Sequence, residues 1–199
     1  MVSINAHNSQ DVFERLKNLS ADIRLVGVVS LTSWDYETER AVLRDVSYNV
    51  WQQCLNKLRR YNFQDLVCPV TELRTIKSLD LSGPMSFRYI CPGIVFEKET
   101  SGQTRIGTPK EAKDGGASTI ILGRTVTELR TIQSLDFTGP NAFRYICPGI
   151  VFEKETSGQT RIGTPKEAKD GGASTIILGR TVTEAENPNE VLVKIKGSL

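Results

Sequence analysis

The sequence predicts an α/β fold of TIM-barrel-like (βα) repeats, arranged as an incomplete or rearranged parallel barrel of about seven strands. Three observations support this class. Short apolar runs alternate with helical patterns along the chain, the segment 71–126 occurs again at 127–182, and glycines follow several of the apolar runs. Alternation of strand and helix is typical of a parallel sheet with right-handed crossovers.

The predicted strands are short runs rich in β-branched and aliphatic residues, each closed by polar residues, glycine or proline. They cover residues 2–6, 25–31, 66–70, 88–91, 119–122, 144–147 and 175–178. Several of them lack a polar–apolar alternation, as expected for parallel strands that are covered on both faces.

Apolar residues spaced by three or four positions predict helices between these strands, over about 9–19 and 47–61. Thr108, Pro109 and Glu111 form the signature of a capping box, and the pair Gly115-Gly116 predicts the end of that helix. A final helix is expected over 184–196.

The chain contains an internal duplication. All differences between the two copies fall between Lys77 and Ser86 of the first, and Val-Thr-Glu occurs at 70–72, 126–128 and 182–184. Recombination at this tripeptide is a simple explanation. The confined divergence slightly favours a selected or built variant over uniform drift. Two copies of a two-strand unit fit a duplicated piece of a larger fold better than a solenoid.

Composition argues against several function classes. The net charge of +2 and the lack of a Lys/Arg run argue against a nucleic-acid partner. No apolar run approaches the roughly 18 residues of a membrane span, and the amino terminus is unlike a signal peptide. The cysteines form no CxxC pair, which suits free thiols in the cytoplasm. We predict neither a metal nor a cofactor.

The candidate ligand site lies in the loops after the last strands of each copy. In the first copy they read Cys91-Pro-Gly-Ile, Gly102-Gln-Thr-Arg-Ile-Gly-Thr-Pro and Ile121-Leu-Gly-Arg. Barrel enzymes often bind a phosphate in their last two βα loops. A lone Gly-Arg is more often a turn with a solvated arginine, but the ordered set of three elements favours an anion site, in which an arginine can bind phosphate bidentately.

This order of motifs resembles the carboxyl-terminal half of the orotidine 5′-phosphate decarboxylase family, with its PGI turn, Gln-Xaa-Arg loop, Thr-Pro-capped helix and terminal Gly-Arg. The runs 3–7, 26–33 and 66–69 are similar to the family's fourth, fifth and sixth strands. The resemblance implies one βα-repeat domain over 1–199. Within it, 1–70 holds strands like barrel strands four to six, 71–126 and 127–182 are the two copies, and 183–199 is the terminal helix.

The resemblance also implies a site for UMP or orotidine 5′-phosphate. Carried over by position, the phosphate is held by Gln159, Gly179 and Arg180, or in the first copy by Gln103, Gly123 and Arg124. We favour the second copy because the terminal helix follows it, as in the family. By the same resemblance, Ser33 faces the pyrimidine, and Pro92 or Pro148 lines the pocket.

The family's activity is that of a carboxy-lyase in pyrimidine nucleotide biosynthesis, and its Asp/Lys array includes an Asp-Xaa-Lys-Xaa-Xaa-Asp run. The 199 residues of this sequence contain no Asp-Xaa-Lys-Xaa-Xaa-Asp run. We therefore assign no catalytic residue and expect nucleotide binding without turnover by the chain alone. Two alternatives stay open: an active decarboxylase completed by a partner chain, and a non-enzymatic duplicated or engineered barrel fragment. The family and bare sheet edges together imply a homodimer or higher homo-oligomer.

Overall fold

The computed structural model describes residues 1–16, 23–44, 47–80, 86–95, 104–122, 143–151 and 163–198. The chain divides into two compact units, Met1–Ser118 (unit 1) and Thr119–Leu199 (unit 2). The domain and segment boundaries expected from the sequence stay predictions.

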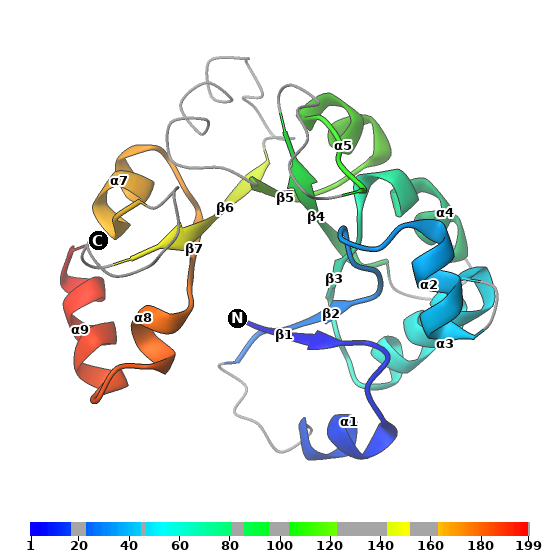
Figure 1. The fold of residues 1–199 in the computed structure, drawn as a ribbon, viewed down its shortest axis with the longest axis horizontal. Coiled ribbons are helices and arrows are strands. Elements are labelled where there is room, and N and C mark those ends of the chain that lie inside the picture. Colours follow the sequence, from blue (N-terminus) through cyan, green and yellow to red (C-terminus); the bar gives the residue numbers. More distant parts are fainter. Residues whose placement is uncertain are drawn as a thin grey trace. The chain divides into compact units, whose positions relative to one another are not determined.

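Unit 1 is built from parallel strands joined by helices (Figure 1). Its strands are β1 (Val2–Asn5), β2 (Leu25–Val28), β3 (Asp65–Val67) and β4 (Arg88–Ile94). Its described helices are α1 (Gln10–Leu16), α2 (Tyr36–Leu43), α3 (Ser47–Arg60), α4 (Val70–Asp80) and α5 (Pro109–Gly115). The strands pair in chain order and in parallel. The predicted parallel βα order is confirmed.

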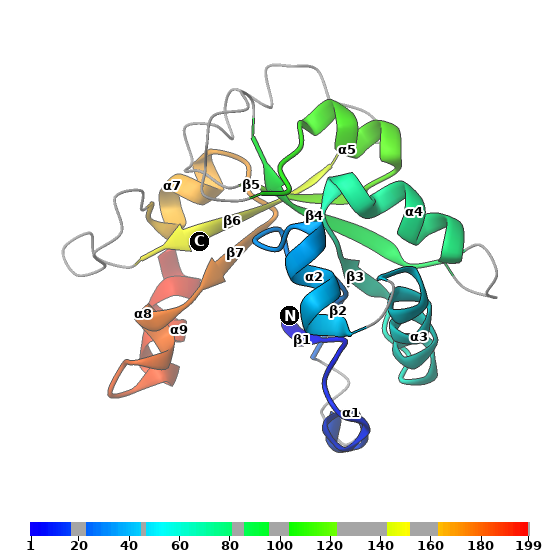
Figure 2. The same cartoon turned by 45° about the vertical axis from the view of Figure 1, so that its right-hand side comes forward.

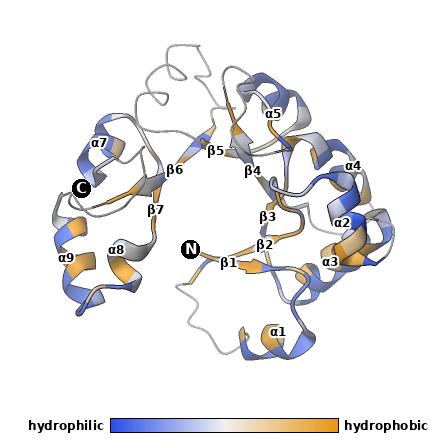
Figure 3. Ribbon diagram, in the orientation of Figure 1, coloured by the Kyte–Doolittle hydropathy of each residue, from blue (hydrophilic) through white to orange (hydrophobic). Residues whose placement is uncertain are grey.

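The core of unit 1 lies between its strands and a layer of helices. Figures 1 and 2 show α3, α4 and α5 side by side along one face of the strands. In Figure 3, β2 and β3 are mainly apolar in colour, whereas α5 is mainly hydrophilic. Burial of each large apolar side chain stabilises the fold by about 1.5–3 kcal/mol. The fully buried ones in unit 1 are Phe13, Leu55, Leu58, Leu66, Leu73, Ile76, Ile90 and Ile94.

Gly27 of β2 allows α3 to pack closely on the sheet. A Cβ atom at Gly27 would lie 2.4 Å from Cδ1 of Leu58, which is fully buried. We expect Gly27→Ala to lower the free energy of unfolding of unit 1 by about 1–3 kcal/mol, because the overpacked leucine has to shift. Both tryptophans, Trp34 and Trp51, lie in unit 1, so their fluorescence during urea unfolding reports on this unit.

Gly197→Ala serves as the control for this substitution. A Cβ atom at Gly197 in the last turn of the chain's final helix meets nothing within 4 Å. The urea midpoint of this variant should equal that of the wild type. An unchanged midpoint for Gly27→Ala would show that the α3–β2 contact can relax without cost.

Unit 2 repeats the parallel arrangement with β5 (Thr119–Leu122), β6 (Arg144–Ile150) and β7 (Thr175–Leu178). Its described helices are α7 (Pro165–Asp170), α8 (Arg180–Thr183) and α9 (Pro188–Ser198). In Figure 3, α7 is mainly hydrophilic. The buried apolar side chains of unit 2 include Phe143, Tyr145, Ile146, Ile150, Ala168 and Ile195.

The two copies of the repeat fold alike where both are described. Thr108 and Glu111 form the predicted capping box at the start of α5, and Thr164 and Glu167 form it at the start of α7. Gly116 caps the carboxyl end of α5, and its φ of 83° lies in the left-handed region that favours glycine. The predicted start and end of this helix are therefore confirmed.

Other boundaries differ from the prediction. Val70 begins α4 instead of closing a strand, and β4 and β6 run on to Ile94 and Ile150. The predicted final helix over 184–196 corresponds to α9, which begins only at Pro188, because proline cannot continue a helix from the residue before it but suits the first helical turn. The short helix α8 lies before the predicted range. Helices α2 and α4 were not predicted. The signal for α2 was Asp35, which caps this helix by accepting a hydrogen bond from the Thr38 N–H.

Candidate functional site

The carboxyl ends of β1 to β4 meet along one edge of unit 1, because the strands are parallel and adjacent. This is the edge at which parallel βα proteins place their binding sites. The segments that reach it are Ala6–His7 after β1, Val29–Asp35 after β2, Cys68–Pro69 after β3 and Val95 after β4.

Thr104 and Arg105, which follow β4 in the sequence, lie at this edge and dock on the loop after β2. The backbone N–H groups of Thr104 and Arg105 donate to the Thr32 carbonyl oxygen at 3.2 and 3.1 Å, and the Thr104 hydroxyl donates to it at 3.2 Å. The Val95 N–H donates to the Gly107 carbonyl at 2.9 Å. Backbone hydrogen bonds thus fix Val95 at the end of β4 and Thr104 and Arg105 on the loop after β2.

A buried ion cluster lies beneath this docked segment. Arg105 Nη1 donates to Ser30 Oγ at 2.6 Å, and Nη2 donates to Glu39 Oε2 at 3.0 Å. Arg105 Nε lies 3.7 Å from Glu72 Oε1, and Ser30 Oγ donates to Glu39 Oε1 at 2.5 Å. The side chains of Arg105 and Glu39 are only 7% and 0% exposed. Their charges are therefore compensated inside the protein.

Sequence reasoning missed this cluster. The Gln-Xaa-Arg motif contains Arg105, but its partner Glu39 lies in helix α2, which was not predicted.

The charge of Arg105 also affects the pKa of Asp35. The Thr38 N–H chiefly lowers the pKa of Asp35, and Arg105 adds to this shift. The loop after β2 is thus held by hydrogen bonds from Thr104 and Arg105.

The predicted pocket residues lie at strand ends. Ser33 is exposed and follows Thr32 in the loop after β2, which is the loop on which Thr104 and Arg105 dock. Pro92 and Pro148 are half-buried in β4 of unit 1 and β6 of unit 2. The roles of these three residues stay predictions.

Most of the predicted phosphate-binding residues lie outside the described residues: Gln103, Gly123, Arg124 and Gln159. Gly179 lies between β7 and α8, and its carbonyl accepts a hydrogen bond from the Val182 N–H at 2.9 Å. A Cβ atom at Gly179 would meet nothing within 4 Å, so the described residues leave room for a side chain there. Arg180 is the first residue of α8.

His7 and Cys54 lie next to the same edge but have structural partners. His7 Nε2 is 2.7 Å from the Val29 carbonyl oxygen, which requires a proton on Nε2, and Nδ1 lies 3.5 Å from Cys54 Sγ. Burial raises the pKa of Cys54 to about 11, despite the opposing charge of Lys57. At neutral pH this thiol is protonated and a poor nucleophile.

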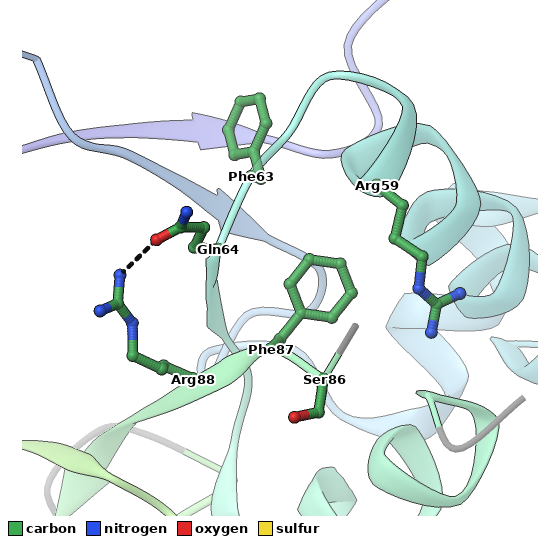
Figure 4. Close-up of a pocket in the computed structure, with 6 residues that line it drawn as sticks. All are labelled: Arg59, Phe63, Gln64, Ser86, Phe87 and Arg88. Carbon is green, nitrogen blue, oxygen red and sulfur yellow. Dashed lines mark hydrogen bonds between the residues drawn. The ribbon is translucent and has the colours of Figure 1, made fainter. Parts of the chain in front are cut away.

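A cavity of about 220 Å³ lies at the opposite edge of unit 1, where β3 and β4 begin (Figure 4). Figure 4 shows Arg88 beside Gln64, with a hydrogen bond of 3.1 Å, and Arg59 on the other side of Phe87. Arg88 also pairs with Asp65, and Arg59 pairs with Asp80. Because both arginines are bound to carboxylates, this cavity is part of the stabilising edge of the sheet.

Within the ranges that the structure describes, no group of three or more His, Cys, Asp or Glu side chains could hold a metal ion. None of the helices in those ranges is long and apolar enough to cross a membrane.

Comparison with known proteins points to one family. The family model described as "Orotidine 5'-phosphate decarboxylase / HUMPS family" matches residues 4–134, which include the whole first copy of the repeat. Orotidine 5'-phosphate decarboxylase of Malacoplasma penetrans is 34% identical over 123 residues, covering 60% of this chain and 50% of that protein. That of Oenococcus oeni is 46% identical over 57 residues, covering 28% and 25%. The chain thus matches half or less of the length of these relatives.

Solved structures show the same fold. The crystal structure of orotidine 5'-phosphate decarboxylase from Lactobacillus acidophilus matches with a TM-score of 0.62 and 17% identity, covering 98% of this chain and 85% of that one. That from Pyrococcus horikoshii OT3 matches with a TM-score of 0.60 and 18% identity, covering 94% and 79%. This likeness confirms the predicted TIM-barrel-like βα class.

Proposed function

Because the chain belongs to the orotidine 5'-phosphate decarboxylase / HUMPS family of pyrimidine biosynthesis, we propose that it binds a pyrimidine nucleoside 5′-monophosphate, UMP or orotidine 5′-phosphate, at the carboxyl edge of unit 1. The names of its relatives supply the ligand class. The docked segment at Thr104 and Arg105 supports this location, because it directly follows Gln103 in the sequence and is hydrogen-bonded beside Ser33.

This location favours the first copy of the repeat, whereas the sequence favoured Gln159 and Arg180 of the second. The docking partners Ser30, Thr32 and Glu39 precede the repeat and occur once in the chain. The family model likewise matches a stretch that ends soon after the first copy. We therefore propose Gln103 as a phosphate ligand and keep the second-copy pair as the alternative.

We further propose that the chain alone does not decarboxylate its ligand. The Asp-Xaa-Lys-Xaa-Xaa-Asp run that the family uses to deliver a proton is not found in these 199 residues. A phosphate grip binds ground state and transition state alike, so it supplies affinity without acceleration. Turnover of orotidine 5′-phosphate by the purified chain, abolished in the Arg180→Ala or Arg124→Ala variant, would establish a working decarboxylase instead.

Gln103→Ala should weaken UMP binding by about tenfold or more, because a hydrogen bond to a charged group contributes about 1.5–3 kcal/mol. Gln159→Ala is the matched control, since it makes the same change in the second copy, and it should leave the affinity within about twofold of the wild type. Isothermal titration calorimetry with UMP measures both. A loss confined to Gln159→Ala would move the phosphate to the second copy. No binding by the wild type at millimolar UMP would reject the proposed function.

A further inference from the structure

We propose that Arg105 is a positioning residue for nucleotide binding, which holds the loop carrying Ser33 in place without touching the ligand itself. This inference rests on the proposed function. It adds a residue to which the family resemblance assigned no role, and it separates this arginine from those that bind phosphate.

The contacts of Arg105 leave its charge committed to the protein. Its guanidinium nitrogens face Ser30 Oγ at 2.6 Å, Glu39 Oε2 at 3.0 Å and Glu72 Oε1 at 3.7 Å. The arginine side chain is 7% exposed. A bound phosphate would have to compete with carboxylates that are already paired with it, at a large desolvation cost. Arg105 is therefore unsuited to be a phosphate ligand.

The same contacts tie together three segments: the loop after β2, helix α2 and the first turn of α4. Ser30 and Thr32 follow β2, Glu39 lies in α2 and Glu72 lies in the first turn of α4, after β3. Arg105 reaches Ser30 through its side chain and Thr32 through its backbone N–H. Residues on both sides of Leu31 are thus pinned just before the exposed Ser33. A binding group is most effective when its own loop is fixed in this way.

The repeat provides an internal comparison. Arg161 occupies the position of Arg105 in the second copy, but Ser30, Thr32 and Glu39 have no second copy. The same substitution can therefore be made at Arg105, which contacts these residues, and at Arg161, for which the sequence holds no second set of them. If Arg105 acts through these partners, only the first-copy substitution alters the site.

The test compares Arg105→Met, Arg161→Met, Ser33→Ala and the double variant Ser33→Ala/Arg105→Met by calorimetric titration with UMP. We expect Arg105→Met to weaken binding by about tenfold, because Ser33 loses its fixed position. Arg161→Met should leave the affinity within about twofold of the wild type. The double variant should bind no more than about twofold worse than Arg105→Met, because the two changes disable the same contact.

Tryptophan fluorescence at each titration temperature establishes that the variants are folded. Asp65→Asn, which removes two ion pairs at the opposite edge of unit 1, serves as a control for general destabilisation and should retain the wild-type affinity. Ser30→Ala keeps the Arg105–Glu39 pair and covers the case that Arg105→Met does not fold; it should weaken binding by about fivefold.

Three results would overturn the inference. The first is wild-type UMP affinity of folded Arg105→Met or, if that variant does not fold, of Ser30→Ala. The second is an equal loss of affinity in Arg161→Met, and the third is a double variant whose loss of affinity is the product of the two single losses. Failure of the wild-type chain to bind UMP would instead reject the proposed function, and this inference with it. The positioning role of Arg105 would be supported if Arg105→Met loses UMP affinity, Arg161→Met does not, and the double variant loses little more than Arg105→Met.

Discussion

Replacing Asp80 with alanine is expected to lower the free energy of unfolding of unit 1 by about 3–5 kcal/mol, because it leaves buried polar groups without their partner. Asp80 is 2% exposed and pairs with Arg59, whose side chain is 15% exposed. The carboxylate also accepts from the Phe87 N–H at 3.0 Å and from the Tyr89 hydroxyl. Burial and this hydrogen bond raise the pKa of Tyr89.

Urea unfolding followed by tryptophan fluorescence measures this loss, because Trp34 and Trp51 both lie in unit 1. Asp136→Ala is the matched control. Asp136 holds the position of Asp80 in the second copy, whereas Arg59 precedes the repeat and occurs once. Its tryptophan midpoint should stay at the wild-type value. Equal midpoints for Asp80→Ala and the wild type would show that water replaces the carboxylate without cost.

Asp65→Asn is expected to lower the free energy of unfolding of unit 1 by about 2–3 kcal/mol, through the loss of charge-assisted hydrogen bonds. Arg24 Nε and Arg88 Nε donate to the Asp65 carboxylate at 2.6 and 3.0 Å, and the side chain of Asp65 is 1% exposed. The effect is smaller than for Asp80, because Arg24 and Arg88 are 38% and 48% exposed and water can solvate them.

The contribution of Asp65 should depend on pH. Burial raises its pKa, but the hydrogen bonds and charges of Arg24 and Arg88 outweigh burial and place the pKa below the ordinary value of 3.8. A lowered pKa in the folded state means that the stabilisation is complete above the unfolded-state pKa. It is lost as the pH falls through the folded-state value. The difference in stability between wild type and Asp65→Asn should therefore be constant above about pH 5 and shrink towards pH 2.

Urea midpoints of the wild type and Asp65→Asn, measured by tryptophan fluorescence between about pH 2 and about pH 5, test this pH dependence. Arg15 provides a control, because its salt bridge with Asp11 is exposed at both side chains, and Arg15→Gln should have almost no effect at any pH. A difference between wild type and Asp65→Asn that grows towards acid pH would contradict the assigned shift.

Local sequence patterns were sufficient for the elements that depend on neighbouring residues. A capping box needs only Thr108 and Glu111 three positions apart, and both copies form it. The strands likewise follow from short apolar runs, although β4 extends three residues past the predicted end, to Ile94. Helix α2 was missed because its apolar face is weak, even though Asp35 caps it.

The candidate site was predictable only in part. The edge of the sheet at which the site is proposed follows from the parallel strand order. The resemblance suggested Ser33 and the Gln-Xaa-Arg loop, whose roles stay predictions. The cluster of Arg105, Ser30 and Glu39 could not be assigned, because Arg105 lies 75 residues after Ser30 and 66 residues after Glu39 in the chain. No periodicity or spacing links such positions.

The sequence by itself determined the parallel βα order, the capping box of the repeat and the duplication, because each depends on short local patterns or on identity between segments. Only the tertiary structure decided which charges meet. The register of β3 and β4 places Asp65 opposite Arg88, and the return of the chain after β4 brings Arg105 onto Thr32. Two nearly identical copies therefore differ in their surroundings, because the residues that a copy contacts are set by the strands packed beside it.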